Sequence, residues 1–250
     1  MAKQNIFDND TFFEGYQALR EKEVNANNLF ELPTLNALMP DLTGKRILDL
    51  GCGSGERCAD YLKRGAVSVV GIDISEKMLE VAKRENADPA ITYLHMAMED
   101  IASLEGPFDV AISSLALHYV EDFAGVIEKV HDLLSEGGIF LFSQEHPFST
   151  CYTGKGERWT RDENGKKIHL NLADYCIEGK RETTWFVDGV QRYHRTFSTT
   201  VNTLAKAGFQ ILQMEEPYAS PEILEKYPEY YDLFHKPDFL FVKAKKTSLY

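Results

Sequence analysis

Three glycines follow a short apolar segment that also carries a carboxylate. Residues 46–50 read Arg-Ile-Leu-Asp-Leu, and Gly51, Gly53 and Gly55 come at alternate positions directly after them. Glycine allows a tight turn and leaves the backbone open to a ligand, because it has no Cβ. The pattern predicts a strand that ends in a ligand-binding turn, with a helix beginning near Gly55.

A second carboxylate, Asp73, stands at the end of the next apolar run, residues 67–72. The carboxyl ends of strands in an open α/β sheet face a ligand crevice, where a carboxylate suits the two hydroxyls of a ribose. A dinucleotide fingerprint would read G-x-G-x-x-G and would hold a pyrophosphate at the helix start. Here Asp49 precedes alternating glycines, so phosphate would be repelled and an ammonium or sulfonium would be favoured.

This arrangement resembles motif I of the class I S-adenosylmethionine (SAM) dependent methyltransferases, whose cofactor carries an ammonium and a sulfonium. Further segments resemble later motifs of the family, in family order, so the resemblance covers roughly residues 40–145. They are the second motif at 73–79, the adenine-edge segment at 96–101, the fourth strand and its loop at 108–119, and the turn into the fifth strand at 133–139. The resemblance implies SAM as cofactor and S-adenosyl-L-homocysteine as product.

The resemblance also implies which residues bind the cofactor. Asp73 would hold the ribose hydroxyls, Ile74 would pack on the adenine, and the backbone N–H of Met98 would reach the adenine ring. The full set of expected cofactor-binding residues is Tyr16, Arg20, Asp49, Gly51, Gly53, Asp73, Ile74, Met78, Met98, Glu99, Ser114, Leu115 and His118.

The adenine-edge segment departs from the family at one position. The family commonly has Asp where Ala97 stands, and that carboxylate contacts the adenine amino group. Glu99 and Asp100 follow closely. Whether one of them replaces the missing contact, or both are merely solvated, stays open at this point.

An apolar stripe at close to helical spacing, including Phe12, Phe13 and Tyr16, predicts a helix over residues 10–21. Most of the stripe is expected to pack against the rest of the protein. In the resembled family an N-terminal helix commonly closes over the cofactor. Tyr16 and Arg20 are therefore predicted to contact the methionine end of SAM.

Apolar runs alternate with helical patterns along the chain, which predicts a parallel sheet flanked by helices. We expect an α/β, Rossmann-like fold with seven strands, and the resemblance implies that the last strand is antiparallel. Strands are expected near 46–50, 67–72, 91–94, 108–113, 138–143, 209–214 and 239–244, and helices near 10–21, 55–64, 75–86, 122–134 and 196–207.

Three parts of the chain are expected to do different work. Residues 1–40 are predicted to be an N-terminal helical segment that closes over the cofactor. Residues 41–145 and 196–250 are predicted to form the SAM-binding methyltransferase domain. Residues 146–195 are predicted to form a small β-rich substrate cap, inserted after the fifth strand.

The cap follows the carboxyl end of a strand, so it should project from the cofactor edge, where loops usually supply specificity. Residues 183–194 read as a hairpin with an Asp188-Gly189 turn. A surface hairpin or a dimer contact is the alternative. Arg195 offers a bidentate fork for a carboxylate, and a salt bridge to the N-terminal segment is the other reading. The expected substrate-binding residues are Trp185, Tyr193, His194 and Arg195.

His146 directly follows the fifth predicted strand and is the candidate general base. A histidine has an ordinary pKa near 6.5, which suits proton removal at neutral pH. The alternative is that His146 only anchors the cap by hydrogen bonding. No covalent nucleophile is needed, because the sulfonium already makes a good leaving group.

Composition favours a small substrate. The formal charge of −12 argues against nucleic acid, which is bound by basic patches. No run approaches the roughly 20 apolar residues that span a bilayer, so we expect a cytoplasmic protein without a membrane partner, either a monomer or a homodimer. The four cysteines lack zinc-ligand spacing, so no metal is expected; they are Cys52, Cys58, Cys151 and Cys176.

The sequence therefore predicts a SAM-dependent methyltransferase that acts on a small molecule. It does not indicate whether the acceptor atom is oxygen, nitrogen or carbon. Two alternatives stay open. An NAD-dependent oxidoreductase shares the sheet and the ribose carboxylate, although Asp49 and Gly55 argue against it. A SAM-binding regulator without turnover would show the same cofactor motifs.

Overall fold

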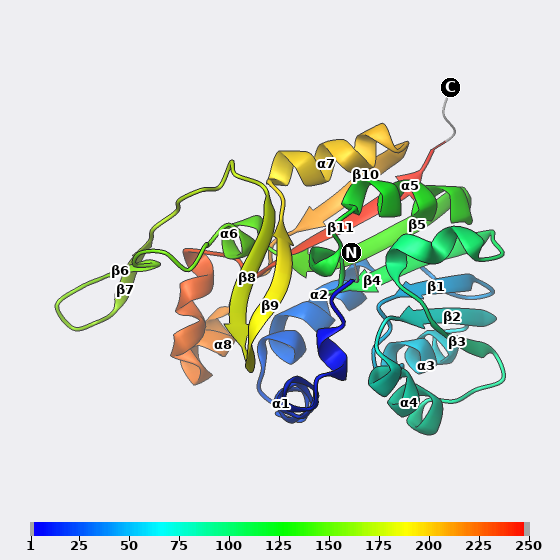
Figure 1. The fold of residues 1–250 in the computed structure, drawn as a ribbon, viewed down its shortest axis with the longest axis horizontal. Coiled ribbons are helices and arrows are strands. Elements are labelled where there is room, and N and C mark those ends of the chain that lie inside the picture. Colours follow the sequence, from blue (N-terminus) through cyan, green and yellow to red (C-terminus); the bar gives the residue numbers. More distant parts are fainter. Residues whose placement is uncertain (1–2, 248–250) are drawn as a thin grey trace.

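The computed structural model describes residues 3–247, so the outermost residues of the predicted N-terminal segment and methyltransferase domain, 1–2 and 248–250, lie outside the described part. A seven-stranded sheet with the order β10-β11-β5-β4-β1-β2-β3 forms the centre of the molecule (Figure 1). The strands are β1 (Arg46–Leu50), β2 (Ser68–Asp73), β3 (Ile91–His95), β4 (Phe108–Ser114), β5 (Leu134–Glu145), β10 (Phe209–Glu215) and β11 (Phe239–Lys246).

Strands β1 to β5 are mutually parallel, and β11 inserts antiparallel between β5 and β10. The predicted Rossmann-like sheet with an antiparallel last strand is therefore confirmed. Because β1, β2, β4 and β5 run in the same direction, their carboxyl ends share one edge of the sheet. The polar side chains that follow these strands are thus brought together.

Helices cover both faces of the sheet. Helices α5 and α7 pack on one face, and α2, α3 and α4 pack on the other. Side-chain caps fix several helix starts: Ser75 accepts from the N–H of Met78, and Thr196 accepts from the N–H of Thr199. The helices are α2 (Leu32–Leu38), α3 (Glu56–Lys63), α4 (Glu76–Glu85), α5 (Phe123–Leu133) and α7 (Phe197–Lys206).

The N-terminal segment crosses the edge of the sheet that carries the glycine turn. Asp8 accepts hydrogen bonds from Ser75 Oγ at 2.5 Å and from the N–H of Lys77 at 3.2 Å, so its carboxylate lies at the start of α4. Gln4 bonds the backbone of Gly189 and Gln191 in the cap. The segment contains η1 (Ile6–Asp8), α1 (Asp10–Arg20) and η2 (Asn27–Glu31).

The insertion contains two separate two-stranded antiparallel sheets. The β6–β7 hairpin extends away from the body, whereas the β8–β9 hairpin lies across the molecule toward α1 (Figure 1). The elements are α6 (Pro147–Thr150), β6 (Trp159–Arg161), β7 (Lys167–Leu170), β8 (Gly179–Trp185) and β9 (Val187–His194).

The predicted turn of the second hairpin was wrong. Trp185 pairs with Val187, so the chain reverses at Phe186, which has a positive φ of 59°. The Asp188-Gly189 pair lies inside β9 instead. The reason is tertiary packing, because the Trp185 and Phe186 rings lie 5.2 and 5.6 Å from the Phe12 ring and fix the tip of the hairpin there.

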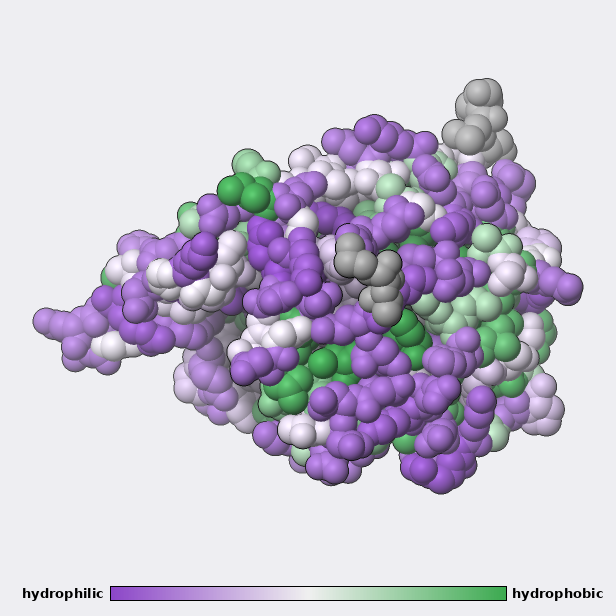
Figure 2. All heavy atoms as spheres, viewed as in Figure 1, coloured by the Kyte–Doolittle hydropathy of each residue, from purple (hydrophilic) through white to green (hydrophobic). Residues whose placement is uncertain are grey.

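Short helices complete the loops at the sheet edge and the connection from β10 to β11. They are η3 (Met98–Ser103), η4 (Leu117–Tyr119), α8 (Pro221–Lys226) and η5 (Pro228–Phe234). The face seen in Figure 2 is mostly hydrophilic, and hydrophobic residues gather between the tip of the β8–β9 hairpin and the N-terminal segment. Within residues 3–247, every helix is too short or too polar to cross a membrane.

Candidate cofactor and acceptor site

All three glycines after β1 have positive φ angles, of 78° at Gly51, 53° at Gly53 and 77° at Gly55. A Cβ at Gly51 would stand 2.6 Å from the Cβ of Ala116, and one at Gly55 would stand 2.3 Å from Tyr93 Oη. A Cβ at Gly53 would meet nothing within 4 Å. Gly51 and Gly55 thus permit close packing, whereas Gly53 leaves its backbone open to a ligand.

Asp73 at the end of β2 ties the glycine turn to the start of α4. Its carboxylate accepts from the N–H of Gly53 at 2.9 Å and from the N–H of Ser75 at 2.8 Å. Burial raises the pKa of Asp73, and these amides oppose that rise. A carboxylate has about four acceptor positions, so the two amides leave capacity for the hydroxyls of a ribose.

Asp49 is 1% exposed, and its Oδ1 atom has no hydrogen-bond partner among the described residues. The other oxygen, Oδ2, accepts from the weak donor Cys58 Sγ at 3.5 Å. Burial raises the pKa of Asp49 to about 6. A buried carboxylate oxygen without a partner is unfavourable, so a cationic ligand group would stabilise it. The ammonium of SAM fits this requirement.

The predicted adenine residues lie beside the same turn. Met98 Cε stands 3.0 Å from the position that a Cβ of Gly51 would take, and the Ile74 carbonyl accepts from Asn5 Nδ2. Met78 is buried in α4. Glu99 has a 19% exposed side chain and Asp100 a 65% exposed one, and both lie near Lys3. Glu99 is thus the more buried of the two, and an adenine contact by either carboxylate stays a prediction.

Tyr16 of α1 lies among the charges of the cofactor edge. Burial raises its pKa, and the charged groups that act on it are Arg20, Glu31, Arg57 and Asp73. The phenol is thus close to Arg20 and Asp73, which are both predicted to bind the cofactor. Contact of Tyr16 and Arg20 with the methionine end of SAM stays a prediction, which this placement favours.

Glu31 of η2 is a residue that the sequence analysis missed. It is completely buried, its Oε2 lies 2.5 Å from Arg57 Nη2, and its Oε1 accepts from Ser114 Oγ at 2.8 Å and Ser143 Oγ at 2.9 Å. This carboxylate therefore joins the N-terminal segment to α3, β4 and β5. The surrounding segment, Asn27–Glu31, has no motif or periodicity that could have marked Glu31 as a buried carboxylate of this site.

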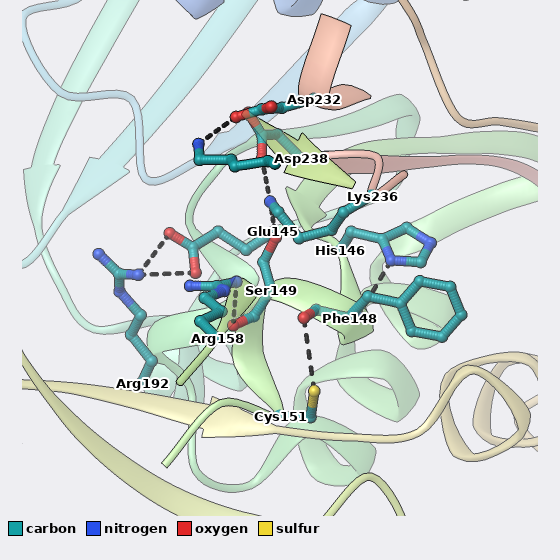
Figure 3. Close-up of polar contacts among 11 residues, drawn as sticks. Glu145, His146, Phe148, Ser149, Cys151, Arg158, Arg192, Asp232, Lys236 and Asp238 are labelled. Carbon is teal, nitrogen blue, oxygen red and sulfur yellow. Dashed lines mark hydrogen bonds and ion pairs between the residues drawn. The ribbon is translucent and has the colours of Figure 1, made fainter. Parts of the chain in front are cut away.

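Beyond the cofactor edge, Glu145 at the end of β5 pairs with Arg192 of β9. Arg192 Nη1 lies 2.8 Å from Glu145 Oε1 and 2.9 Å from Oε2, and Figure 3 shows the two side chains pointing toward each other. The guanidinium carbon stands 5.5 Å from the centre of the Trp185 ring. Tyr119 belongs to the same group. Burial, Glu145 and Tyr16 raise the pKa of its phenol, and Arg192 lowers it.

The predicted base, His146, is fixed at both ring nitrogens. Nδ1 accepts from the N–H of Phe148 at 3.1 Å, which makes His146 the N-cap of α6 (Figure 3), and Nε2 lies 2.7 Å from Glu216 Oε1. The side chain is 2% exposed, and burial lowers its pKa. These contacts support the anchoring alternative, and a catalytic role stays a prediction.

The predicted substrate residues divide into two groups. Trp185 lies beside Arg192 and Tyr16, and substrate binding by Trp185 stays a prediction. His194 is fully buried, with Thr150 Oγ1 and the Tyr175 carbonyl each 2.8 Å from a ring nitrogen.

The other two predicted substrate residues face η4 and α5. Arg195 donates to the carbonyls of Val120 and Glu121 and lies over the Phe123 ring, and burial lowers its pKa to about 10. The same guanidinium also lies over the Tyr193 ring, with its carbon 5.9 Å from the ring centre. Substrate binding by His194, Arg195 and Tyr193 therefore stays a prediction without a supporting contact.

The loop after β4 connects the two halves of the site. Leu115 has a positive φ of 50°, and its N–H bonds both the carbonyl and the hydroxyl of Ser143. His118 Nδ1 accepts from the N–H of Glu145 at 3.3 Å. Burial lowers the pKa of His118 well below its ordinary value, and the cations Arg192 and Arg195 lower it further, so the ring is neutral.

The fold and its two strand-end carboxylates define a protein that binds an adenosine-linked cation. A model of the methyltransferase domain matches residues 48–142. A solved SAM-dependent methyltransferase from Mesorhizobium loti is 39% identical, with a TM-score of 0.78; the match covers 90% of this chain and 99% of that one.

Two curated relatives extend this similarity. An uncharacterized protein of Haemophilus influenzae is 43% identical over 98% of both chains, and so includes the cap. The demethylmenaquinone methyltransferase of Lactococcus lactis is 34% identical over 71% of both chains. The chain belongs to the SAM-dependent methyltransferases, and SAM is its cofactor. The alternative of an NAD-dependent oxidoreductase is therefore wrong.

Proposed function

We propose that the protein transfers the methyl group of SAM to a small-molecule acceptor and releases S-adenosyl-L-homocysteine. One observation carries the proposal. Asp73 acts on the buried phenol of Tyr16, and the Tyr16 ring stands 6.1 Å from the Trp185 ring. Arg192 lies over Trp185 and pairs with Glu145, so a chain of neighbouring side chains joins the two ends of the site. A cofactor bound at the first end thus has an acceptor site at the other end.

Bound SAM supplies a methyl group on a positively charged sulfur. The chain itself would bind and align. Asp73 would hold the ribose hydroxyls, Asp49 the ammonium, and the open backbone at Gly53 the methionine part. Alignment of two reactants can contribute about 7–11 kcal/mol to a bimolecular reaction, so this holding accounts for much of the catalysis.

The three parts of the chain would divide the work as the sequence predicts. Residues 1–40 would close over the cofactor, as the bonds from Asp8 to the start of α4 support. Residues 41–145 and 196–250 would bind SAM, and 146–195 would cover the acceptor. The Trp185 and Tyr119 rings favour an aromatic acceptor, and one relative is named for demethylmenaquinone.

A formal charge of −12 disfavours nucleic acid as the acceptor. We propose a small metabolite, a cytoplasmic location, no membrane partner, and a monomer or homodimer. Size-exclusion chromatography with light scattering would decide between the two oligomeric states.

Calorimetric titration with SAM and, separately, with NADH tests the cofactor half. Saturable binding of SAM without binding of NADH is expected. Release of S-adenosyl-L-homocysteine in a screen of small aromatic acceptors tests the transfer half. Saturable SAM binding without product release from any acceptor would contradict methyl transfer and would support a non-catalytic regulator.

A further inference from the structure

The carboxylate of Glu145 lies on the acceptor side of the site. Glu145 is the last residue of β5 and stands two positions after Ser143, so both side chains project from the same face of the strand. Ser143 Oγ contacts the buried Glu31, whose charge also reaches Tyr16. Glu145 therefore borders the space next to the cofactor edge, with 19% of its side chain exposed.

The ion pair with Arg192 leaves donors unused. One nitrogen, Nη1, contacts both oxygens of Glu145, instead of the two parallel bonds of a fork-like pair. The buried Nε of Arg192 has no hydrogen-bond partner among the described residues. An incoming oxygen atom could therefore bind this guanidinium while the carboxylate stays beside it. The Trp185 ring lies under Arg192 and stacks with Phe186, so the guanidinium is bordered by aromatic side chains.

Several charged groups surround Glu145. Burial raises its pKa, Arg192 and then Lys236 lower it, and Asp238 raises it again. Lys236 bonds Asp238 and Ser149, on the side of Glu145 away from Arg192 (Figure 3). Tyr119 faces the pair from η4, and the backbone N–H of Glu145 donates to neutral His118. Arg192 is thus the cation in direct contact with Glu145 among the described residues.

We propose that Arg192 binds the oxygen of an aromatic or enolic hydroxyl and that Glu145 accepts its proton, which makes the reaction an O-methylation. This inference rests on the proposed function. The O–H bond breaks and its proton goes to Glu145. The oxygen lone pair forms the new bond to the methyl carbon, the carbon–sulfur bond breaks, and its electron pair stays on sulfur. The proton then leaves to solvent.

The arrangement matches the acidity of such a hydroxyl. A guanidinium beside the oxygen stabilises the anion and lowers the pKa of the hydroxyl. Burial raises the pKa of the carboxylate, which makes it a stronger base. His146, the alternative base, has both nitrogens engaged and lies on the far side of Glu145 from Arg192, beside Phe148 (Figure 3).

The test uses the full-length protein, SAM and two probes, 4-methylphenol and 4-nitrophenol. The nitrophenol is largely ionised in mildly alkaline solution, whereas the methylphenol is not. Glu145→Gln should lower turnover of 4-methylphenol about 100-fold, the usual contribution of a general base, but should lower turnover of 4-nitrophenol only a few-fold. The remaining activity of Glu145→Gln on 4-methylphenol should rise with pH in proportion to the ionised fraction of that phenol.

Two variants serve as comparisons. Glu182→Gln removes an exposed carboxylate of β8 that pairs with Lys180, and it should turn over both phenols at the wild-type rate. His146→Gln should lower turnover of both phenols by the same small factor. If instead His146→Gln shows the selective loss on 4-methylphenol and Glu145→Gln does not, the assignment of the base is overturned.

Calorimetry with SAM separates this inference from the proposed function. Wild type and Glu145→Gln should bind SAM with equal affinity. Methyl transfer to anilines or thiols but to neither phenol would overturn the O-methylation while leaving the proposed function intact. Absence of transfer to every acceptor, with SAM bound, would overturn both, and absence of SAM binding would contradict the cofactor site itself.

Discussion

The two ends of the site are built in different ways. At the cofactor end, Asp73 is held by the backbone amides of Gly53 and Ser75, and both belong to the loops that follow neighbouring strands. At the proposed acceptor end, Glu145 is held by the side chain of Arg192, 47 residues away in the inserted cap. The first end is fixed by the sheet, whereas the second exists only when the cap is docked.

This difference separates binding from turnover. Substitutions at the cofactor end should change SAM affinity, because the sheet keeps the rest of the site in place. Substitutions at the acceptor end should change the rate with little effect on SAM affinity. Glu31 lies between the two ends, since it bonds α3 as well as the ends of β4 and β5.

The largest effect is expected where the two ends meet. Glu31→Ala would leave Arg57 and two serine hydroxyls without their buried acceptor, and loss of one partner of a buried ion pair lowers stability by about 3–5 kcal/mol. Urea unfolding would measure this loss. Glu182→Ala, which removes an exposed partner of Lys180, should stay within about 1 kcal/mol of wild type. Equal losses in both variants would contradict a junction at Glu31.

A large effect confined to the cofactor end is expected from Asp73→Ala. Loss of charge-assisted hydrogen bonds to a ribose should weaken SAM binding about 100-fold, or about 3 kcal/mol, while circular dichroism stays unchanged. Asp100→Ala removes a nearby exposed carboxylate and should bind SAM as wild type does. Unchanged affinity in Asp73→Ala would refute the ribose assignment.

A smaller effect at the same end depends on pH. Burial holds the pKa of Asp49 at about 6, above its ordinary 3.8, so the folded protein takes up a proton below pH 6. Its stability therefore falls as pH rises from about 4 to about 6. An ammonium needs the ionised form, so SAM affinity should be about tenfold lower at pH 5 than at pH 7.

Calorimetry at the two pH values would measure this dependence. Asp49→Asn should bind SAM weakly and almost independently of pH across the same range. A wild-type affinity that does not change between pH 5 and pH 7 would contradict an ammonium contact at Asp49.

The smallest effect is expected at the tip of the cap. The Phe186 ring is 41% exposed and stands beside Gly15 and Phe12, so Phe186→Ala should lower stability by about 1 kcal/mol or less. Phe12→Ala removes a fully buried ring and should lower stability by about 3–5 kcal/mol. Comparable losses would show that the hairpin tip is more firmly docked than its exposure indicates.

The sequence was sufficient for the sheet and for the meeting of Asp73 with the glycine turn, because both depend on short-range patterns. The alternating glycines, the two strand-end aspartates and the Ser75 cap all act within a few residues of one strand end. Because the strands are parallel, their carboxyl ends then meet at one edge of the sheet, and no long-range side-chain contact is needed. The helices accordingly begin and end close to their predicted limits.

The acceptor end could not be predicted in the same way. Glu145 and Arg192 meet only after a long insertion has folded, and no local pattern links them. His146 was chosen from its place after the fifth strand and Arg195 from its bidentate fork, and both roles stay predictions. The local Asp188-Gly189 signal was overridden because two rings of the hairpin pack on Phe12. The Glu145–Arg192 pair and the hairpin turn thus both depend on long-range contacts.

A crystal structure of the protein with S-adenosyl-L-homocysteine would test the central claim most directly. We predict that the ribose hydroxyls lie within hydrogen-bond distance of Asp73, that the amino group fills the unpartnered side of Asp49 Oδ1, and that the sulfur faces Tyr119 and Glu145. Ligand density away from the ends of β1 and β2 would contradict this account.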